Sequence, residues 1–380
     1  MRFLRKNRVR KTLLVISDIH LGAGNYVNNQ RNFLEDFHYD KEMVEILEYF
    51  STGDYVNREV ELVINGDLFD LLAVPFVPYF DDEFWSEEAA LEKLKMIMDA
   101  HPEVMQALND FLLRKKKNIV FVIGNHDAEF VFPSLQKYFN YYFDEKARRD
   151  FEIRIPSDGE YRPEPDVVLM HGHEYEPAHL FDPDRSILED RDGRKYFIPP
   201  WGSYYVTKVL NKFKEQRNHV NAVRPIHKFV INGFIYDPLY TVRFGLANFF
   251  YFVMVRFIYF FKLKNGFKET FQSALNELEL FQDYETLTED YFEQNPEVKA
   301  LIVGHTHDPK IRTFSNGKIF INTGTWTDMH YLDFDRQDMG RLLTFAQLDF
   351  FAKADTEQEA IFRINLNYWK GFNNLPFEEV

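Results

Sequence analysis

Residues 13–22 read LLVISDIHLG, so an apolar run passes directly into an aspartate and a histidine. Four more runs behave in the same way. They lie at 62–65 before Gly66-Asp67, 119–123 before GNHD at 124–127, 167–170 before His171, and 301–303 before GHTH at 304–307. Runs with apolar residues on both faces are typical of strands covered on both sides, so this pattern predicts a layered α/β architecture.

The polar clusters that follow these runs form an ordered set of metal-ligand residues. In order they are Asp18-x-His20, Gly66-Asp67, Gly124-Asn125-His126-Asp127, His171 and Gly304-His305-x-His307. Carboxylate, imidazole and amide donors without sulfur suit Mn, Fe or Zn. In Asp-x-His and His-x-His, alternate residues face the same side of an extended backbone, so both side chains can reach one site. The clusters therefore predict a metal site in loops at strand ends, where α/β folds usually place their chemistry.

Composition excludes several function classes. The 380 residues contain no cysteine, which rules out disulfides, thiolate metal sites and cysteine nucleophiles and fits the cytosol. A net charge of -15 argues against general nucleic-acid binding. The apolar run at 13–16 is shorter than the roughly 7–15 residues of a signal-peptide core, so no export is expected.

The middle of the chain interrupts the strand pattern. Helices are expected at 31–50 and 87–114, and β-rich sequence after 310. Within 176–297 the expected helices are 203–217, 240–263, 267–282 and 286–294. We therefore predict a catalytic domain formed by 1–175 and 298–380, with 176–297 as a mostly helical insert that caps it.

The ordered motifs resemble those of the calcineurin-like metallophosphoesterase family, whose pattern is D-x-H, G-D, G-N-H-[D/E], H and G-H-x-H. Every element is present in order, and the resemblance covers 12–175 and 298–330 well. It implies a four-layer αββα sandwich and hydrolysis of a phosphoester by two divalent ions, with Mn expected and Fe or Zn as alternatives.

The resemblance also implies a role for each residue. One metal would be held by Asp18, His20, Asp67 and His307, and the second by Asp67, Asn125, His171 and His305, with Asp67 bridging. Such a metal pair can hold a bridging hydroxide and clamp phosphoryl oxygens during in-line displacement.

His126 is not a ligand in this family. It would stabilise charge on the phosphoryl group or protonate the leaving oxygen, and Asp70 is a candidate to orient it. His173 and Asp127 are additional candidates for the site. The remaining histidines have no motif and are expected to be structural or superficial; they are His38, His101, His179, His219, His227 and His330.

The substrate is indicated by a finer resemblance. The segments 17–22, 66–70 and 304–307 look like those of UDP-2,3-diacylglucosamine hydrolases of the lipid A pathway, which also carry a helical insert as an acyl-binding lid. Here the insert is longer, GNHD replaces the more usual GNRD, and HGH replaces HGD. The resemblance therefore implies a divergent relative acting on a lipid-linked sugar nucleotide.

An aromatic stretch at 244–261 bears on the same question, because only Gly245, Asn248 and Arg256 within it are neither apolar nor aromatic. A helix here could lie in a membrane interface or wall an acyl groove through Phe249, Phe257 and Phe260. Burial in a core or a dimer interface is the alternative, whereas spanning a bilayer would place Arg256 inside it at a cost of several kcal/mol. The first interpretation predicts peripheral attachment to the inner face of the cytoplasmic membrane.

Basic residues of the insert are candidates to contact a diphosphate or anionic headgroups, with an ordinary solvated face as the alternative. They are Arg185, Arg191, Arg194, Lys195, Lys208 and Lys212.

Three functions compete. The leading one is a peripheral hydrolase of a lipid-linked pyrophosphate. The second is a soluble phosphodiesterase or nucleotidase with a dimerising aromatic helix. A non-catalytic metal-bound scaffold is disfavoured by the complete ligand set. The pattern leaves the native metal, the leaving group and the oligomeric state open.

Overall fold

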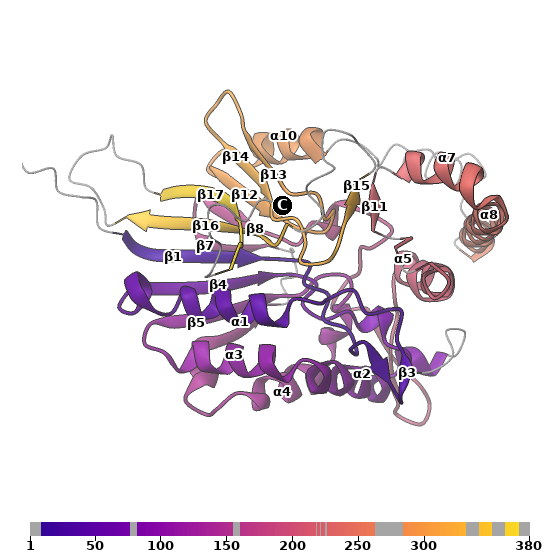
Figure 1. Cartoon of the computed structure of the whole chain (residues 1–380), viewed down its shortest axis with the longest axis horizontal. Coiled ribbons are helices and arrows are strands. Elements are labelled where there is room, and N and C mark those ends of the chain that lie inside the picture. Colours follow the sequence, from indigo (N-terminus) through magenta and orange to yellow (C-terminus); the bar gives the residue numbers. More distant parts are fainter. Residues whose placement is uncertain are drawn as a thin grey trace, which may run out of the picture.

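The computed structural model describes residues 9–76, 82–154, 160–217, 219–220, 222–224, 226–262, 284–331, 342–351 and 362–371. The helix expected at 267–282 lies outside these residues. Among the described ones, two large β-sheets form the centre of the molecule, and helices cover their outer faces (Figure 1).

The larger sheet has six strands in the order β17-β16-β1-β4-β5-β6. Strands β1, β4, β5 and β6 run parallel, and β16 and β17 continue the sheet antiparallel. Their bounds are Val9–Ile16 for β1, Glu59–Asn65 for β4, Lys117–Val122 for β5, Phe151–Arg154 for β6, Thr344–Phe351 for β16 and Phe362–Tyr368 for β17.

The smaller sheet has five strands in the order β13-β14-β12-β8-β7. The central β14, β12 and β8 are parallel, and the two edge strands are antiparallel. The bounds are Tyr161–Glu164 for β7, Val167–Leu169 for β8, Ala300–Val303 for β12, Lys310–Thr313 for β13 and Ile319–Asn322 for β14.

The two sheets pack face to face through buried aliphatic side chains, among them Leu13, Val63, Leu169 and Ile302. Helices α1 (Asp40–Tyr49), α2 (Glu87–Ala100), α3 (Pro102–Leu113) and α4 (Pro133–Tyr142) cover the outer face of the larger sheet. Helix α10 (Tyr284–Gln294) packs on the smaller sheet through Phe292. The predicted four-layer α/β sandwich is confirmed.

Two helices differ from the expectation. The segment 87–114 forms two helices, because Pro102 lacks the N–H that a continuing helix needs and begins α3 at its first position. Helix α1 begins only at Asp40, and residues 26–31 instead form the short hairpin of β2 (Tyr26–Val27) and β3 (Gln30–Arg31).

The segment between β8 and β12 is largely helical but also contains short strands. Its helices are α5 (Trp201–Tyr205), the π-helical Val206–Leu210, α6 (Asn211–Lys214), α7 (Ile226–Tyr236) and α8 (Pro238–Lys262). Its strands are β9 (Ile187–Glu189) and β10 (Lys195–Phe197), which form a hairpin, and β11 (Val223–Arg224), which pairs with β15 (His330–Tyr331). Helices α7 and α8 lie at one side of the sandwich (Figure 1).

A buried charge cluster fixes the loop that follows β1. The Glu35 carboxylate accepts the N–H groups of Gly22 and Gly24 at 3.2 and 2.5 Å and lies 3.8 Å from His101 Nε2. His101 Nδ1 lies 2.7 Å from Asp40 Oδ1. Burial lowers the pKa of His101, but Asp40 and Glu35 outweigh it and raise that pKa from 6.5 to about 9.

This cluster predicts a pH-dependent stability. Because the folded-state pKa of His101 is raised, its stabilisation is fully present below pH 6.5 and is lost as pH rises through about 9. His101→Gln should therefore lower the free energy of unfolding by up to about 3 kcal/mol more at pH 6 than at pH 10. Denaturant unfolding at both pH values measures this difference. His38→Gln, at an exposed position, is the control, and an equal loss for His101→Gln at both pH values would contradict the assignment.

Candidate metal centre

The metal-ligand motifs meet where strands of both sheets end. The loops after β1 and β4 are joined because Asp18 N donates to Gly66 O at 3.1 Å and His20 N donates to Asp67 O at 3.0 Å. The loop after β12 joins them through His305 N, which donates to the Asp18 carboxylate at 3.0 Å. The two sheets thus bring the predicted ligands to one place.

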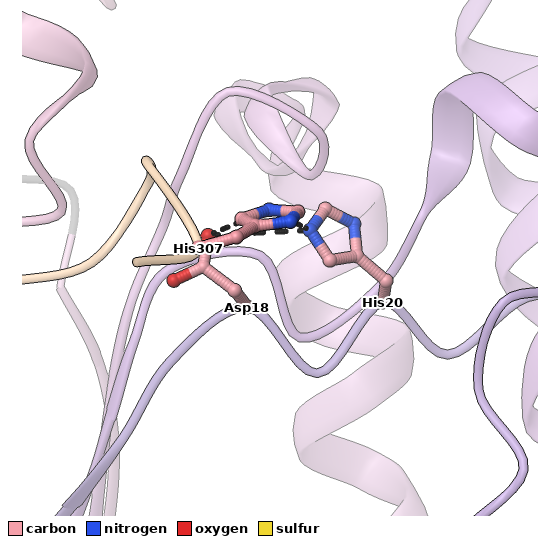
Figure 2. Close-up of side chains that lie close together, drawn as sticks. All are labelled: Asp18, His20 and His307. Carbon is pink, nitrogen blue, oxygen red and sulfur yellow. Dashed lines mark hydrogen bonds and ion pairs between the residues drawn. The ribbon is translucent and has the colours of Figure 1, made fainter. Parts of the chain in front are cut away.

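A first group consists of Asp18, His20 and His307 (Figure 2). His307 Nε2 lies 3.3 Å from Asp18 Oδ1 and 3.0 Å from His20 Nε2. Asp18 is fully buried and His20 nearly so. The His307 side chain is 20% exposed, so two ring nitrogens and a carboxylate oxygen face one another in a largely buried place that water can still reach.

A second group is built around Asp67 and His171. His171 Nε2 lies 3.2 Å from both Asp67 Oδ2 and Asn125 Oδ1. His171 Nδ1 lies 2.9 Å from the Asn65 carbonyl, and donating to that oxygen orients the ring so that Nε2 faces Asp67. His305 belongs to the same group. Asp67 Oδ2 is also 3.8 Å from His20 Nε2, so this carboxylate lies between the two groups.

The backbone around these groups is strained and closely packed. Five of the predicted ligands have left-handed φ angles between 51° and 68°, which cost a non-glycine residue about 1–3 kcal/mol each; they are Asp18, His20, Asp67, His305 and His307. A Cβ on Gly66 would lie 2.1 Å from His171 Nδ1, and one on Gly124 would lie 2.2 Å from Asp67 Oδ1. The two motif glycines therefore provide the space that the ligand side chains occupy.

The charges in the centre also fit divalent cations. Burial raises the pKa of Asp67, but His171 and His126 outweigh it and hold that pKa well below its usual range. Burial likewise opposes ionisation of Asp18, and His171 and His307 lower its pKa. Two ionised carboxylates beside imidazole nitrogens and an amide oxygen are a donor set that Mn, Fe or Zn can use.

His126 and Asp70 form a pair beside the first group. His126 Nδ1 lies 2.8 Å from Asp70 Oδ1, and the His126 ring meets the His20 ring edge-on at 4.6 Å. Burial lowers the pKa of His126, but Asp70 and Asp67 raise it to about 9. The geometry is that of a protonated imidazole held by a carboxylate, with Nε2 left for another partner.

The two additional candidates lie beside the predicted ligands but belong to neither donor group, and the His173 ring centre is 5.5 Å from that of His171. Asp127 accepts the N–H of Gly124 at 2.5 Å and that of Leu68 at 2.8 Å, which joins the loops after β4 and β5. Burial and Asp67 raise the pKa of Asp127 to about 7. His173 is buried and stacks on Phe181 with ring centres 5.3 Å apart. The contacts of Asp127 indicate loop organisation, and those of His173 indicate packing.

The basic candidates are distributed along the insert. Arg194 binds Glu83 with both terminal nitrogens, at 2.9 and 2.6 Å, and Arg185 lies 3.6 Å from Asp182. Lys208 lies over the Tyr204 ring. Lys195 is half-buried, and Arg191 and Lys212 are exposed.

The aromatic candidates lie on α8. Phe249 is 61% exposed, and its neighbour Phe250 is 66% exposed. The side chains of Phe257 and Phe260 lie outside those that the structure describes. Helix α8 is long and apolar enough to cross a membrane by length and composition, and 22% of the window Pro238–Val255 is buried.

Two residues at the centre were not predicted from the sequence. Glu176 Oε2 lies 3.2 Å from His305 Nε2, and His179 Nε2 lies 3.6 Å from the same oxygen. His179 Nδ1 is 3.5 Å from Asn125 Nδ2. His179 was expected to be structural or superficial, but the structure places it beside the predicted ligands. The Glu-x-x-His spacing shortly after His171 was the available signal, because it brings both side chains onto one turn.

Comparison with known proteins identifies the family. The model of the calcineurin-like phosphoesterase family matches residues 11–309. No curated protein matches.

Several solved structures are similar at low identity. A dimetal phosphatase from Danio rerio is 14% identical, with 90% of this chain and 94% of that chain covered and a TM-score of 0.36. Calcineurin-like phosphoesterase YfkN from Bacillus subtilis is 14% identical, with 95% and 91% covered and a TM-score of 0.35. A predicted phosphoesterase from Streptococcus pneumoniae is 11% identical, with 95% and 90% covered and a TM-score of 0.29.

Proposed function

The chain belongs to the calcineurin-like phosphoesterase family of metal-dependent hydrolases, and from this premise we propose that it hydrolyses a P–O bond at a dinuclear centre. The observation that carries the proposal is the pair of buried donor groups that meet at Asp67. One ion is assigned to Asp18, His20, Asp67 and His307, and the other to Asp67, Asn125, His171 and His305. When bound, two divalent ions supply positive charge that orients phosphoryl oxygens and makes a water molecule more acidic.

His126 is the proposed acid of this reaction. Its contact with Asp70 supports this role, because a carboxylate on Nδ1 fixes the ring and stabilises the protonated form. Burial lowers the pKa of His126, but the adjacent Asp70 carboxylate raises it, which favours the protonated imidazole. In that form it can stabilise charge on the phosphoryl group or give its proton to the leaving oxygen.

The proposed substrate is a lipid-linked sugar nucleotide such as UDP-2,3-diacylglucosamine. The support is the motif resemblance together with an apolar surface on α7 and α8, whose exposed side chains include Ile235, Tyr236, Leu239, Phe249 and Phe250. Acyl chains or a membrane interface would cover such a surface. The same surface also favours the alternative, a soluble phosphodiesterase or nucleotidase that dimerises through α8.

The proposed location is the cytoplasmic face of a membrane. Helix α8 contains Arg243, Arg256 and Lys262 but no acidic residue. An apolar helix with only positive charges is suited to a bilayer that contains anionic lipid.

A substrate assay tests the function. With Mn²⁺, the protein should hydrolyse UDP-2,3-diacylglucosamine, and His126→Ala should lower kcat by about 10²–10⁴ because the acid is lost. Metal content, measured by elemental analysis, should stay unchanged in that variant. A bis-aryl phosphodiester and nucleic acid serve as competing substrates. Hydrolysis of the diester alone would reject the lipid assignment, and hydrolysis of none by the metal-loaded protein would reject the enzymatic proposal.

A partition assay tests the membrane surface. Replacing Phe249 and Phe250 with Ser should weaken binding to anionic vesicles at least about tenfold, because each buried Phe side chain contributes about 1.5–3 kcal/mol. Tyr141→Ser is the matched control, since Tyr141 has the same 61% exposure as Phe249 but lies on α4. Co-sedimentation with vesicles measures the partition. Equal binding by wild type and the Phe variant would contradict membrane attachment through α8. Dissociation of a dimer by that variant would support the alternative.

A further inference from the structure

The turn at 176–179 opens the insert and reaches the second donor group. Glu176 Oε2 lies 3.2 Å from His305 Nε2, at the distance of an ion pair. The same carboxylate oxygen lies 3.6 Å from His179 Nε2. The His179 and His305 rings meet edge-on with their centres 5.1 Å apart. The turn thus presents a carboxylate to a predicted metal ligand.

The contact with Glu176 determines which nitrogen of His305 is available to a metal. A neutral imidazole carries one proton, and a carboxylate beside Nε2 favours the form that is protonated there. Nδ1 is then the nitrogen with a free lone pair. His305 belongs to the group that contains Asp67 and His171, so its remaining nitrogen is the one that can serve the second ion. Carboxylates that accept from the second nitrogen of a ligand histidine orient the ring and make it more basic.

Other parts of the insert contact this turn. Gly202 N, in α5, donates to the Ala178 carbonyl at 2.8 Å. A Cβ on Gly202 would lie 2.6 Å from that oxygen and 2.7 Å from His179 Cε1, so helix and turn are in direct contact. Helix α8 is tied to α5 in turn, because Tyr251 Oη donates to the Trp201 carbonyl at 2.8 Å. The turn that carries Glu176 is therefore held by the insert through Ala178 and His179, and by the loop after β8 through Glu176 N, which donates to the His173 carbonyl at 2.9 Å.

We propose that Glu176 is a positioning residue for the second metal ion, accepting a hydrogen bond from His305 Nε2 so that Nδ1 faces the ion. The inference rests on the proposed dinuclear site and deepens it. It makes the insert part of the metal centre, since the second ion depends on a carboxylate from outside the five family motifs.

The test is metal binding resolved by site. Mn²⁺ titration of the metal-free full chain, followed by calorimetry and by electron paramagnetic resonance, should show two ions in wild type. Glu176→Ala should lower the affinity for the second ion by about 10–100-fold, the usual effect of removing a hydrogen-bond partner of a ligand histidine. The affinity for the first ion should change much less, because that ion is assigned to Asp18, His20 and His307 together with the bridging Asp67.

Two further variants separate positioning from a general structural role. In Glu176→Gln the amide oxygen can still accept from His305 Nε2, so most of the affinity for the second ion should return. Glu189→Gln changes an exposed carboxylate of β9 and should leave both affinities at the wild-type values. Equal affinity for the second ion in wild type and Glu176→Ala overturns the inference, as does a failure of Glu176→Gln to recover any of the loss. Absence of a second ion from wild type would instead overturn the proposed dinuclear function.

Discussion

Two carboxylates, Asp18 and Asp67, are buried at the junction of the two sheets with almost no exposure to water. An isolated buried anion costs several kcal/mol, so each must be neutralised by nearby positive charge. Histidines surround both carboxylates, and their nitrogens lie 3.2–4.0 Å from the acidic oxygens. Two divalent cations would neutralise the carboxylates more completely than imidazoles do. They would also accept the lone pairs that the nitrogens and oxygens otherwise direct at one another.

This constraint accounts for much of the surrounding structure. The left-handed backbone at five of the predicted ligands is strain that is retained where their side chains converge. Outside the donor groups, Asp127 joins two of the loops, Asn65 orients His171, and Glu35 holds the loop after β1. Each of these residues acts on a ligand or its loop through a hydrogen bond, so the centre depends on a second layer of polar groups as much as on the ligands.

The sandwich, and the polar side chains that meet at its strand ends, could be predicted because both are local features of the sequence. An apolar run followed by Asp-x-His or Gly-Asp marks a strand and its loop without knowledge of the rest of the chain. Glu176 and His179 could not be assigned in that way, since their role arises from contacts with His305 and Asn125 that only the folded insert brings about. The break at Pro102 is a local signal as well, because a proline begins a helix more readily than it continues one. The basic residues of the insert were candidates by charge alone, and Arg194 instead binds Glu83.

The central claim is that two ions share Asp67. Anomalous diffraction from crystals grown with Mn²⁺, combined with elemental analysis of the same protein, tests it most directly. Two peaks about 3.5–4 Å apart with Asp67 between them are expected. One peak should be lost in His307→Ala and both in Asp67→Ala. A single peak in wild type, or two peaks that persist in Asp67→Ala, would show that the two ions do not share Asp67.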